Sequence, residues 1–311
     1  MSDCDHLQNF SAPALQSLGY YMEFLSLPIL TEVHFPLLRS PGRSLLLEDT
    51  PLLSTVTASL NTPFNASVNI INTSLSNLDF LYAENATEER PGGPLFSSDF
   101  IDSYDYGRTQ FFIFDNPHLE WIKGPAYKYS NVTIQNNGLS TSIDFPNLEN
   151  CSHFYVSSTT NLNIPSLVNV EGLFSIVNNS MVDLSLPRLQ AIGQDLTIAN
   201  NTRLQFFNSS VSKIGSSYPS DVLISGNPAL QSISLPKVTA IDGIIISSNP
   251  VLQTINFQEV TDIGYQTIIQ NNPALSSINL DHLSTFFRTM NISGNFSRYD
   301  NLPLHRRYKL M

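Results

Sequence analysis

The residues of this sequence that could carry chemistry are few and dispersed. The signatures His-Glu-x-x-His, Gly-x-Ser-x-Gly, Cys-x-x-Cys and the phosphate-binding loop do not occur in it. The six histidines lack the spacing of metal ligands. Asp99, Asp102 and Asp105 form an acidic run that could bind Ca²⁺, although a solvated loop is the favoured interpretation. We therefore expect no catalytic residue, no metal and no cofactor.

The elements that would position any functional residue follow from a repeat. Asn-Pro-x-Leu begins at Asn116, Asn227, Asn249 and Asn272, and the last three are 22 and 23 residues apart. A period of this size indicates a solenoid, and it is too short for a helix pair or a four-stranded blade. The sequence thus predicts an all-β, mainly parallel β-solenoid over residues 1–311. We expect a single domain, a right-handed coil of about 13 turns.

An asparagine occupies the same place in most repeats, and Thr159 holds that place between Asn137 and Asn179. Stacked asparagine side chains can satisfy one another and the backbone groups of the turns. We expect a structural ladder, not a ligand site. Its members are Asn116, Asn137, Asn179, Asn201, Asn227, Asn249, Asn272 and Asn295. Glycines that close coils are expected to need positive φ, and they are Gly172, Gly193, Gly243 and Gly264.

The segment 82–107 lacks the repeat and is rich in Asp, Glu, Pro and Gly. Asn72 and Asn116 are 44 residues apart, which equals two periods. The segment is therefore either a degenerate coil or an acidic loop that protrudes from the solenoid. Neither end of the chain carries the polar cap that a solenoid requires, so both end caps are interpreted as incomplete.

A short β-rich triplet precedes each asparagine, and alternate residues of such a strand point to opposite sides. From Phe112 to Ser293, the two outward positions read for each strand hold no charged residue. A parallel β-helix enzyme that cleaves polysaccharide needs two carboxylates about 5 to 10 Å apart. This class of enzyme is therefore disfavoured.

Aromatic side chains stand beside hydroxyl and amide groups on three successive outward strands. Such a mixture suits stacking on sugars or anchoring a protein partner. The alternative is that the segment 82–107 covers the aromatic residues. The candidate binding face consists of Phe112, Phe114, Thr133, Gln135 and Tyr155.

Composition narrows the class of partner and the location. Charged residues make up 13% of the chain, the net charge is −11 and the pI is about 4.8, which argues against nucleic acid and anionic membrane surfaces. No apolar run is long enough for direct membrane insertion. Eleven Asn-x-Ser/Thr triplets favour a glycoprotein, but Asn295 is expected to be buried and unmodified. The glycosylation candidates are Asn65, Asn72, Asn85, Asn131, Asn150, Asn208 and Asn291.

The ends of the chain do not fit a complete secreted protein. Polar residues follow Met1 in place of a secretory signal, and no hydrophobic tail for a lipid anchor is present. We interpret the chain as a fragment or an imperfect gene model; a cytosolic repeat protein is the alternative. Cys4 and Cys151 lie about six coils apart and are not expected to pair.

The whole series Asn-Pro-x-Leu-x-x-Ile-x-Leu/Phe-Pro-x-Leu-x-x-Ile-x-Gly, with strands such as Ile244-Ile245-Ile246, resembles the receptor L-domain type of leucine-rich repeat. It is most similar to the fungal GPI-anchored cell-wall-organisation proteins, over about residues 10–300. The resemblance implies a role in wall integrity at the cell surface, with no catalytic residues to carry over. That family has a signal peptide, cysteines at its caps, a Ser/Thr-rich stalk and an anchor signal, which this chain lacks.

Three hypotheses about function remain. The first is a non-catalytic cell-surface glycoprotein that contributes to cell-wall organisation. The second is a receptor-like or adhesive module that binds a cell-wall polysaccharide or a surface protein. The third, which the uncharged outward positions disfavour, is a parallel β-helix enzyme that acts on polysaccharide.

Overall fold

The computed structural model describes residues 4–39, 42–58, 66–81, 109–124, 127–138, 140–215 and 219–295. The chain is an all-β parallel β-solenoid of about 11 turns. A single short 3-10 helix, η1 (Asp79–Leu81), is the only helical element of these ranges. The chain divides into two compact units, Met1–Leu148 and Glu149–Met311, where the sequence predicts one domain. Each unit is described by itself.

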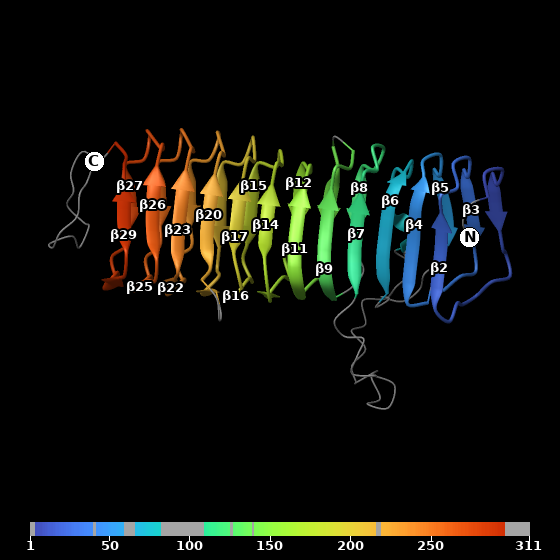
Figure 1. Cartoon of the computed structure of the whole chain (residues 1–311), viewed down its shortest axis with the longest axis horizontal. Helices are drawn as coiled ribbons and strands as arrows, with labels where there is room; N and C mark the ends of the chain where they lie inside the picture. Colours follow the sequence, from blue (N-terminus) through green and yellow to red (C-terminus); the bar gives the residue numbers. More distant parts are fainter. Residues whose placement is uncertain are drawn as a thin grey trace, which may run out of the picture. The chain divides into compact units, whose positions relative to one another are not determined.

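In the first unit, successive coils each contribute one strand to a long parallel sheet (Figure 1). Its strands are β2 (Tyr21–Leu25), β4 (Ser44–Thr50), β6 (Ser67–Thr73), β7 (Gln110–Phe114) and β9 (Lys128–Gln135). Shorter strands form further parallel ladders elsewhere on each coil. These are β1 (Asn9–Ser11), β3 (Glu32–Phe35), β5 (Thr55–Ala58), β8 (Trp121–Lys123) and β10 (Ser142–Asp144).

The second unit repeats this arrangement with more regular coils (Figure 1). Its long-sheet strands are β11 (Asn150–Ser157), β14 (Phe174–Val177), β17 (Leu196–Ala199), β20 (Asp221–Ser225), β23 (Gly243–Ser247), β26 (Gln266–Gln270) and β29 (Thr289–Ile292). A second ladder contains β15 (Asp183–Leu186), β18 (Phe206–Ser209), β21 (Ser232–Ser234), β24 (Thr254–Asn256) and β27 (Ser277–Asn279), and β12 (Asn161–Asn163) precedes them in the chain. The corner strands are β13 (Asn169–Val170), β16 (Ala191–Ile192), β19 (Lys213–Ile214), β22 (Ala240–Ile241), β25 (Asp262–Ile263) and β28 (Thr285–Phe286).

The strands β6 and β7 pair directly, although 36 residues separate their ends. Val68 lies opposite Phe111 and Ile70 opposite Ile113. The expectation of two periods between Asn72 and Asn116 was therefore wrong, because these residues complete a single step of the solenoid. The segment 82–107 adds no coil to the long sheet, which is one reason for about 11 turns in place of about 13. The segment itself lies outside the described residues.

The core is built by the alternation of side chains along the long-sheet strands. Inward residues such as Leu45, Val68 and Phe111 are at most 2% exposed, whereas their neighbours along each strand are half-buried. In the second unit, Phe154 and Phe174 stack with ring centroids 5.4 Å apart. One coil cannot enclose its own apolar side, so burial requires neighbouring coils. The predicted one-sided burial of the strands is confirmed.

The motif Asn-Pro-x-Leu forms a β-turn that leaves the long sheet. The amide of Leu119 donates to the carbonyl of Asn116 at 3.1 Å, and Leu230, Leu252 and Leu275 close their turns in the same way. Proline is favoured after the first residue of such a turn because its ring fixes φ near −65°. The turn then directs the leucine into the core, where all four side chains are fully buried.

Each coil reaches this turn through one residue in the left-handed region of backbone conformation. Asn136, Asn178 and Asn200 have φ of 53°, 57° and 56°, and each directly precedes a ladder asparagine. Asparagine, aspartate and glycine tolerate this conformation best. The residues with this positive φ are, in chain order, Ser26, Asp49, Asn72, Asp115, Asn136, Ser158, Asn178, Asn200, Gly226, Ser248 and Asn271.

The glycines expected to supply positive φ do not do so. Gly172, Gly193, Gly243 and Gly264 are not among the described residues with positive φ. They are required for close packing between coils instead. A methyl group at Gly193 would overlap the carbonyl of Glu171 in the preceding coil, and the equivalent positions collide with side chains of the coil before.

The asparagine ladder joins neighbouring coils within each unit. The side-chain oxygen of Asn227 accepts hydrogen bonds from the backbone amide and the side-chain amide of Asn201, at 2.9 and 3.1 Å. The side-chain amide of Asn227 donates to Asn249 and to the carbonyls of Ile198 and Ser225, at 3.0 to 3.1 Å. The same pattern links Asn116 to Asn137 and runs from Asn179 to Asn272.

Threonine begins the ladder in both units, and the last expected asparagine does not belong to it. The amides of Thr73 and Thr159 donate to Asn116 and Asn179, each at 3.0 Å. Asn295 was expected to be buried, but it is exposed, and its amide bonds to the carbonyl of Leu275 at 2.7 Å. The physical reason is its place after β29, the last described strand, where no further described coil covers it.

We predict that Asn227→Ala lowers the free energy of unfolding by about 3 to 5 kcal/mol, because several buried donors and acceptors lose their partner at once. Urea unfolding followed by circular dichroism measures the change. Asn208→Ala is the matched control, since Asn208 is exposed on β18. Equal effects of the two substitutions would show that the ladder does not stabilise the fold.

Candidate binding surfaces

The outward face of the first unit brings together four of the five residues of the candidate binding face. Phe112 lies opposite Thr133 and Phe114 opposite Gln135 on the neighbouring strand. The two phenylalanine rings are 5.6 Å apart between centroids, with their planes inclined by 35°. All four residues are half-buried. They form a flat surface of aromatic, hydroxyl and amide groups.

Tyr155, the fifth candidate, belongs to the second unit. It lies on β11 opposite Ser175 and is half-buried. Further along this outward row, Leu223, Ile245 and Ile268 follow one another on adjacent strands.

Sequence reasoning missed two carboxylates on the outward face of the first unit. Glu23 on β2 is exposed, and Glu48 on β4 is half-buried. Glu48 lies opposite Leu25, two residues along the strand from Glu23, so the two carboxylates stand on one face of adjacent strands. The alternation of Tyr21–Leu25 could have revealed them, but outward positions were assigned only from Phe112 onwards.

In the second unit, aspartates cluster on the outward side where the strands of the long sheet begin. The amide of Asp221 donates to Asp195 at 2.8 Å, and the amide of Ser220 donates to Asp242 at 2.9 Å. Burial raises the pKa of Asp221, and repulsion from Asp195 and Asp242 raises it further. Asp195 and Asp242 therefore cap backbone amides at a strand start, at the cost of like-charge repulsion.

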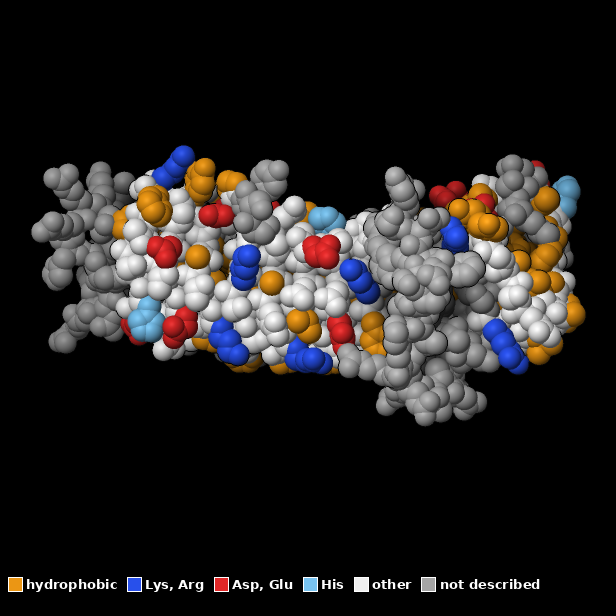
Figure 2. Space-filling view, turned by 90° about the horizontal axis from the view of Figure 1, so that it is seen from below, with side chains coloured by type: hydrophobic (Ala, Val, Ile, Leu, Met, Phe, Trp, Pro, Cys, Tyr) orange, Lys and Arg blue, Asp and Glu red, His pale blue; other side chains and the backbone are white. Residues whose placement is uncertain are grey.

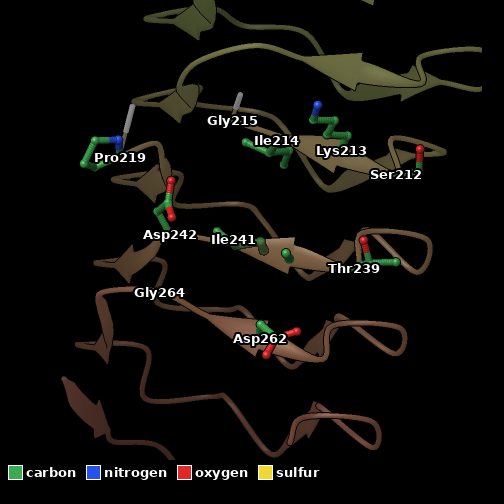
Figure 3. Close-up of a pocket in the computed structure, with 11 residues that line it drawn as sticks. Ser212, Lys213, Ile214, Gly215, Pro219, Thr239, Ile241, Asp242, Asp262 and Gly264 are labelled. Carbon is green, nitrogen blue, oxygen red and sulfur yellow. The ribbon is translucent and has the colours of Figure 1, made fainter. Parts of the chain in front are cut away.

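The same region contains a shallow groove of about 840 Å³ (Figure 3). The coil from Asn201 to Asn227 is longer than its neighbours, and the corner ladder that reaches β19 resumes only at β22. Ile214 and Ile241 supply apolar lining, with Lys213, Asp242 and Asp262 as charged groups. Hydrogen bonds from Thr261 and Thr285 lower the pKa of Asp262. Its carboxylate is thus held by hydroxyl donors, as Asp242 is held by an amide.

Charged side chains are sparse on one face of the second unit. On the face shown in Figure 2, basic and acidic side chains of the second unit stand singly among uncharged ones. Within the described ranges, no group of three or more His, Cys, Asp or Glu residues could hold a metal ion. None of the helices described is long and apolar enough to cross a membrane. Asp99, Asp102 and Asp105 lie outside the described residues.

The glycosylation candidates occupy three kinds of place. Asn72 and Asn208 are exposed, whereas Asn131, Asn150 and Asn291 are half-buried within strands. Asn65 and Asn85 lie outside the described residues. Four acceptor triplets left out of the candidates also begin at exposed residues, and these are Asn9, Asn178, Asn200 and Asn295.

The two cysteines are free thiols, as expected. Cys4 is exposed, and Cys151 is buried at the start of β11. Burial raises the pKa of the Cys151 thiol, with a smaller contribution from the negative charge of Glu171. A buried thiol that keeps its proton is a poor nucleophile, so Cys151 acts as a small core residue.

Comparison with known proteins gives one weak similarity. Over 137 residues the chain is 26% identical to a protein from Arthroderma benhamiae described as a cell surface GPI-anchored protein. The match covers 43% of this chain and 28% of that relative, so the chain spans less than a third of the relative's length. No protein-family model and no solved structure match the chain.

We predict that Asp221→Asn raises the free energy of unfolding at pH 7. A carboxyl with a higher pKa in the folded than in the unfolded state opposes folding once it ionises. This penalty is absent below the ordinary pKa of 3.8, grows as the pH rises to the folded pKa, and is complete above it.

Urea unfolding of both proteins between pH 3 and pH 7 measures this difference. The advantage of Asp221→Asn should disappear toward the acidic end. Asp183→Asn, at an exposed position of β15, controls for the general loss of negative charge. A gain that does not vary with pH, or that the control shares, would contradict the assignment of repulsion to Asp221.

Proposed function

We propose that this chain is part of a non-catalytic cell-surface glycoprotein that contributes to the organisation of a fungal cell wall. The observation that carries the proposal is the similarity to a cell surface GPI-anchored protein of a fungus. A surface rich in Asn, Ser and Thr, with exposed acceptor triplets at Asn72, Asn178 and Asn208, supports it. The proposal places this chain outside the cell.

We further propose that the coils are leucine-rich repeats of the receptor L-domain type. Support comes from the turn Asn-Pro-x-Leu, which sends its leucine into the core, and from the asparagine at a fixed position of successive coils. In such a solenoid, the repeat supplies a scaffold, and function depends on the residues that the outward face presents.

A non-catalytic role is supported by the use of the carboxylates. Asp195, Asp242 and Asp262 accept hydrogen bonds from backbone amides or hydroxyl groups of their own unit. Groups engaged in this way stabilise the coil. Among the described residues, Glu23 and Glu48 are a pair of carboxylates on one outward face of adjacent strands, as a polysaccharide-cleaving enzyme needs, and they provide the test of this alternative.

The location is tested by gel mobility of the native protein in cell-surface and cytosolic fractions, before and after endoglycosidase treatment. We expect a surface form whose mobility shifts by several glycans, because oligosaccharide is added only in the secretory pathway. Substitution of Asn72, Asn178 and Asn208 by Gln is expected to reduce the shift. An unshifted band confined to the cytosol would refute the surface proposal.

The absence of catalysis is tested with the purified protein and isolated wall polysaccharides. No release of reducing ends is expected over hours of incubation at pH 4 to 7. If reducing ends are released and Glu23→Gln or Glu48→Gln stops the release, the protein is an enzyme and the non-catalytic proposal fails. Asp183→Gln serves as the control substitution, because Asp183 is far along the chain from Glu23 and Glu48.

A further inference from the structure

Phe112 and Phe114 form a continuous aromatic platform on the outward face of β7. They are two residues apart on one strand, so both rings stand on the same side of the sheet. Their centroids are 5.6 Å apart and their planes differ by 35°. Both side chains are half-buried, so part of each ring faces outward.

Uncharged side chains border this platform on the neighbouring strands, with polar ones at most positions and the apolar Ile71 opposite Phe114. Asn69 lies opposite Phe112 on β6, and Thr133 and Gln135 lie opposite the two rings on β9. Gln110 and Asn131 continue the polar border at the start of β7 and β9. These side chains offer hydroxyl and amide groups, both donors and acceptors, around the rings.

One of these polar groups has no hydrogen-bond partner among the described residues. The side-chain oxygen of Asn69 is buried and accepts no hydrogen bond from a described residue. A buried acceptor without a donor is unfavourable. Because this oxygen is inaccessible to solvent, Asn69 contributes to the platform only as an uncharged polar neighbour of Phe112.

We propose that this platform, the residues Phe112 and Phe114 with their polar border, binds a neutral polysaccharide. A sugar ring has a C–H face that can stack on the negative face of an aromatic ring, and hydroxyl groups at its rim that can bond to amides and hydroxyls. The proposal rests on the cell-surface function proposed above and names the ligand of that surface.

Charge and composition select this ligand class. The net charge of −11 repels an anionic polysaccharide. The residues paired with the two rings are uncharged, and Glu48 is separated from Phe114 in the same row by Ile71, so no carboxylate adjoins the rings to attract a cationic polysaccharide. Protein partners are anchored most often by Trp, Tyr and Arg, none of which occurs among these residues. An uncharged chain of sugars fits both the rings and their amide border.

The test is the depletion of purified full-length chain by suspensions of cellulose, chitin and insoluble β-1,3-glucan, with immobilised polygalacturonate as the anionic comparison. We expect saturable binding to at least one neutral polymer and none to polygalacturonate. Phe112→Leu combined with Phe114→Leu keeps an apolar surface but removes the rings, and should weaken binding about tenfold or more. Phe112→Tyr with Phe114→Tyr should retain it.

Trp121→Leu is the control within the same unit, because Trp121 is an exposed aromatic residue on β8, in a different ladder. Thermal unfolding confirms that each variant is folded. The proposal is overturned if no neutral polymer binds the protein. It fails as well if the leucine variant binds as tightly as the parent, because an apolar surface without rings would then be sufficient. It is also overturned if Trp121→Leu weakens binding equally. None of these outcomes depends on the result of the glycosylation experiment. The polysaccharide-binding proposal and the cell-surface proposal can therefore fail independently of each other.

Discussion

The structure depends on hydrogen-bond partners for the backbone amides and carbonyls at the corner where each coil leaves its long strand. There the chain turns sharply inside the protein, and a buried amide or carbonyl without a partner is costly. Each ladder asparagine resolves this problem for neighbouring coils, since Asn227 receives two hydrogen bonds from Asn201 and donates to Asn249 and Ile198. The apolar core can stack only because this corner is satisfied.

This requirement explains the composition of the repeat. A residue with positive φ precedes the ladder position, and a proline follows that position in six coils. The leucine three positions after the asparagine then enters the core. The polar residues at these positions are therefore structural. The content of charged side chains is low because amide and hydroxyl side chains supply the hydrogen bonds that the turns require.

Function has to reside on what the scaffold leaves facing outward. In the second unit, Asp195, Asp242 and Asp262 accept hydrogen bonds from backbone amides or hydroxyl groups. The negative charges of Asp195 and Asp242 disfavour the ionised form of Asp221. The first unit presents a different surface, in which two phenylalanine rings stand within an uncharged border. Such a surface has the means to bind, and Glu23 and Glu48 stand on the same outward face.

The sequence by itself determined the solenoid class, the strands, their buried side and most of the ladder, because these depend on local spacing within one coil. It did not determine the number of turns, since pairing of β6 with β7 joins residues 43 apart in the chain. It also misjudged Asn295, which no described coil covers, and the glycines, whose role is set by the coil beside them. The clustering of Asp221 with Asp195 and Asp242, and of Phe112 and Phe114 with Asn69, likewise required the tertiary structure. In each case the deciding contact comes from another coil, and a repeat pattern specifies what one coil needs before it specifies which coil will be its neighbour.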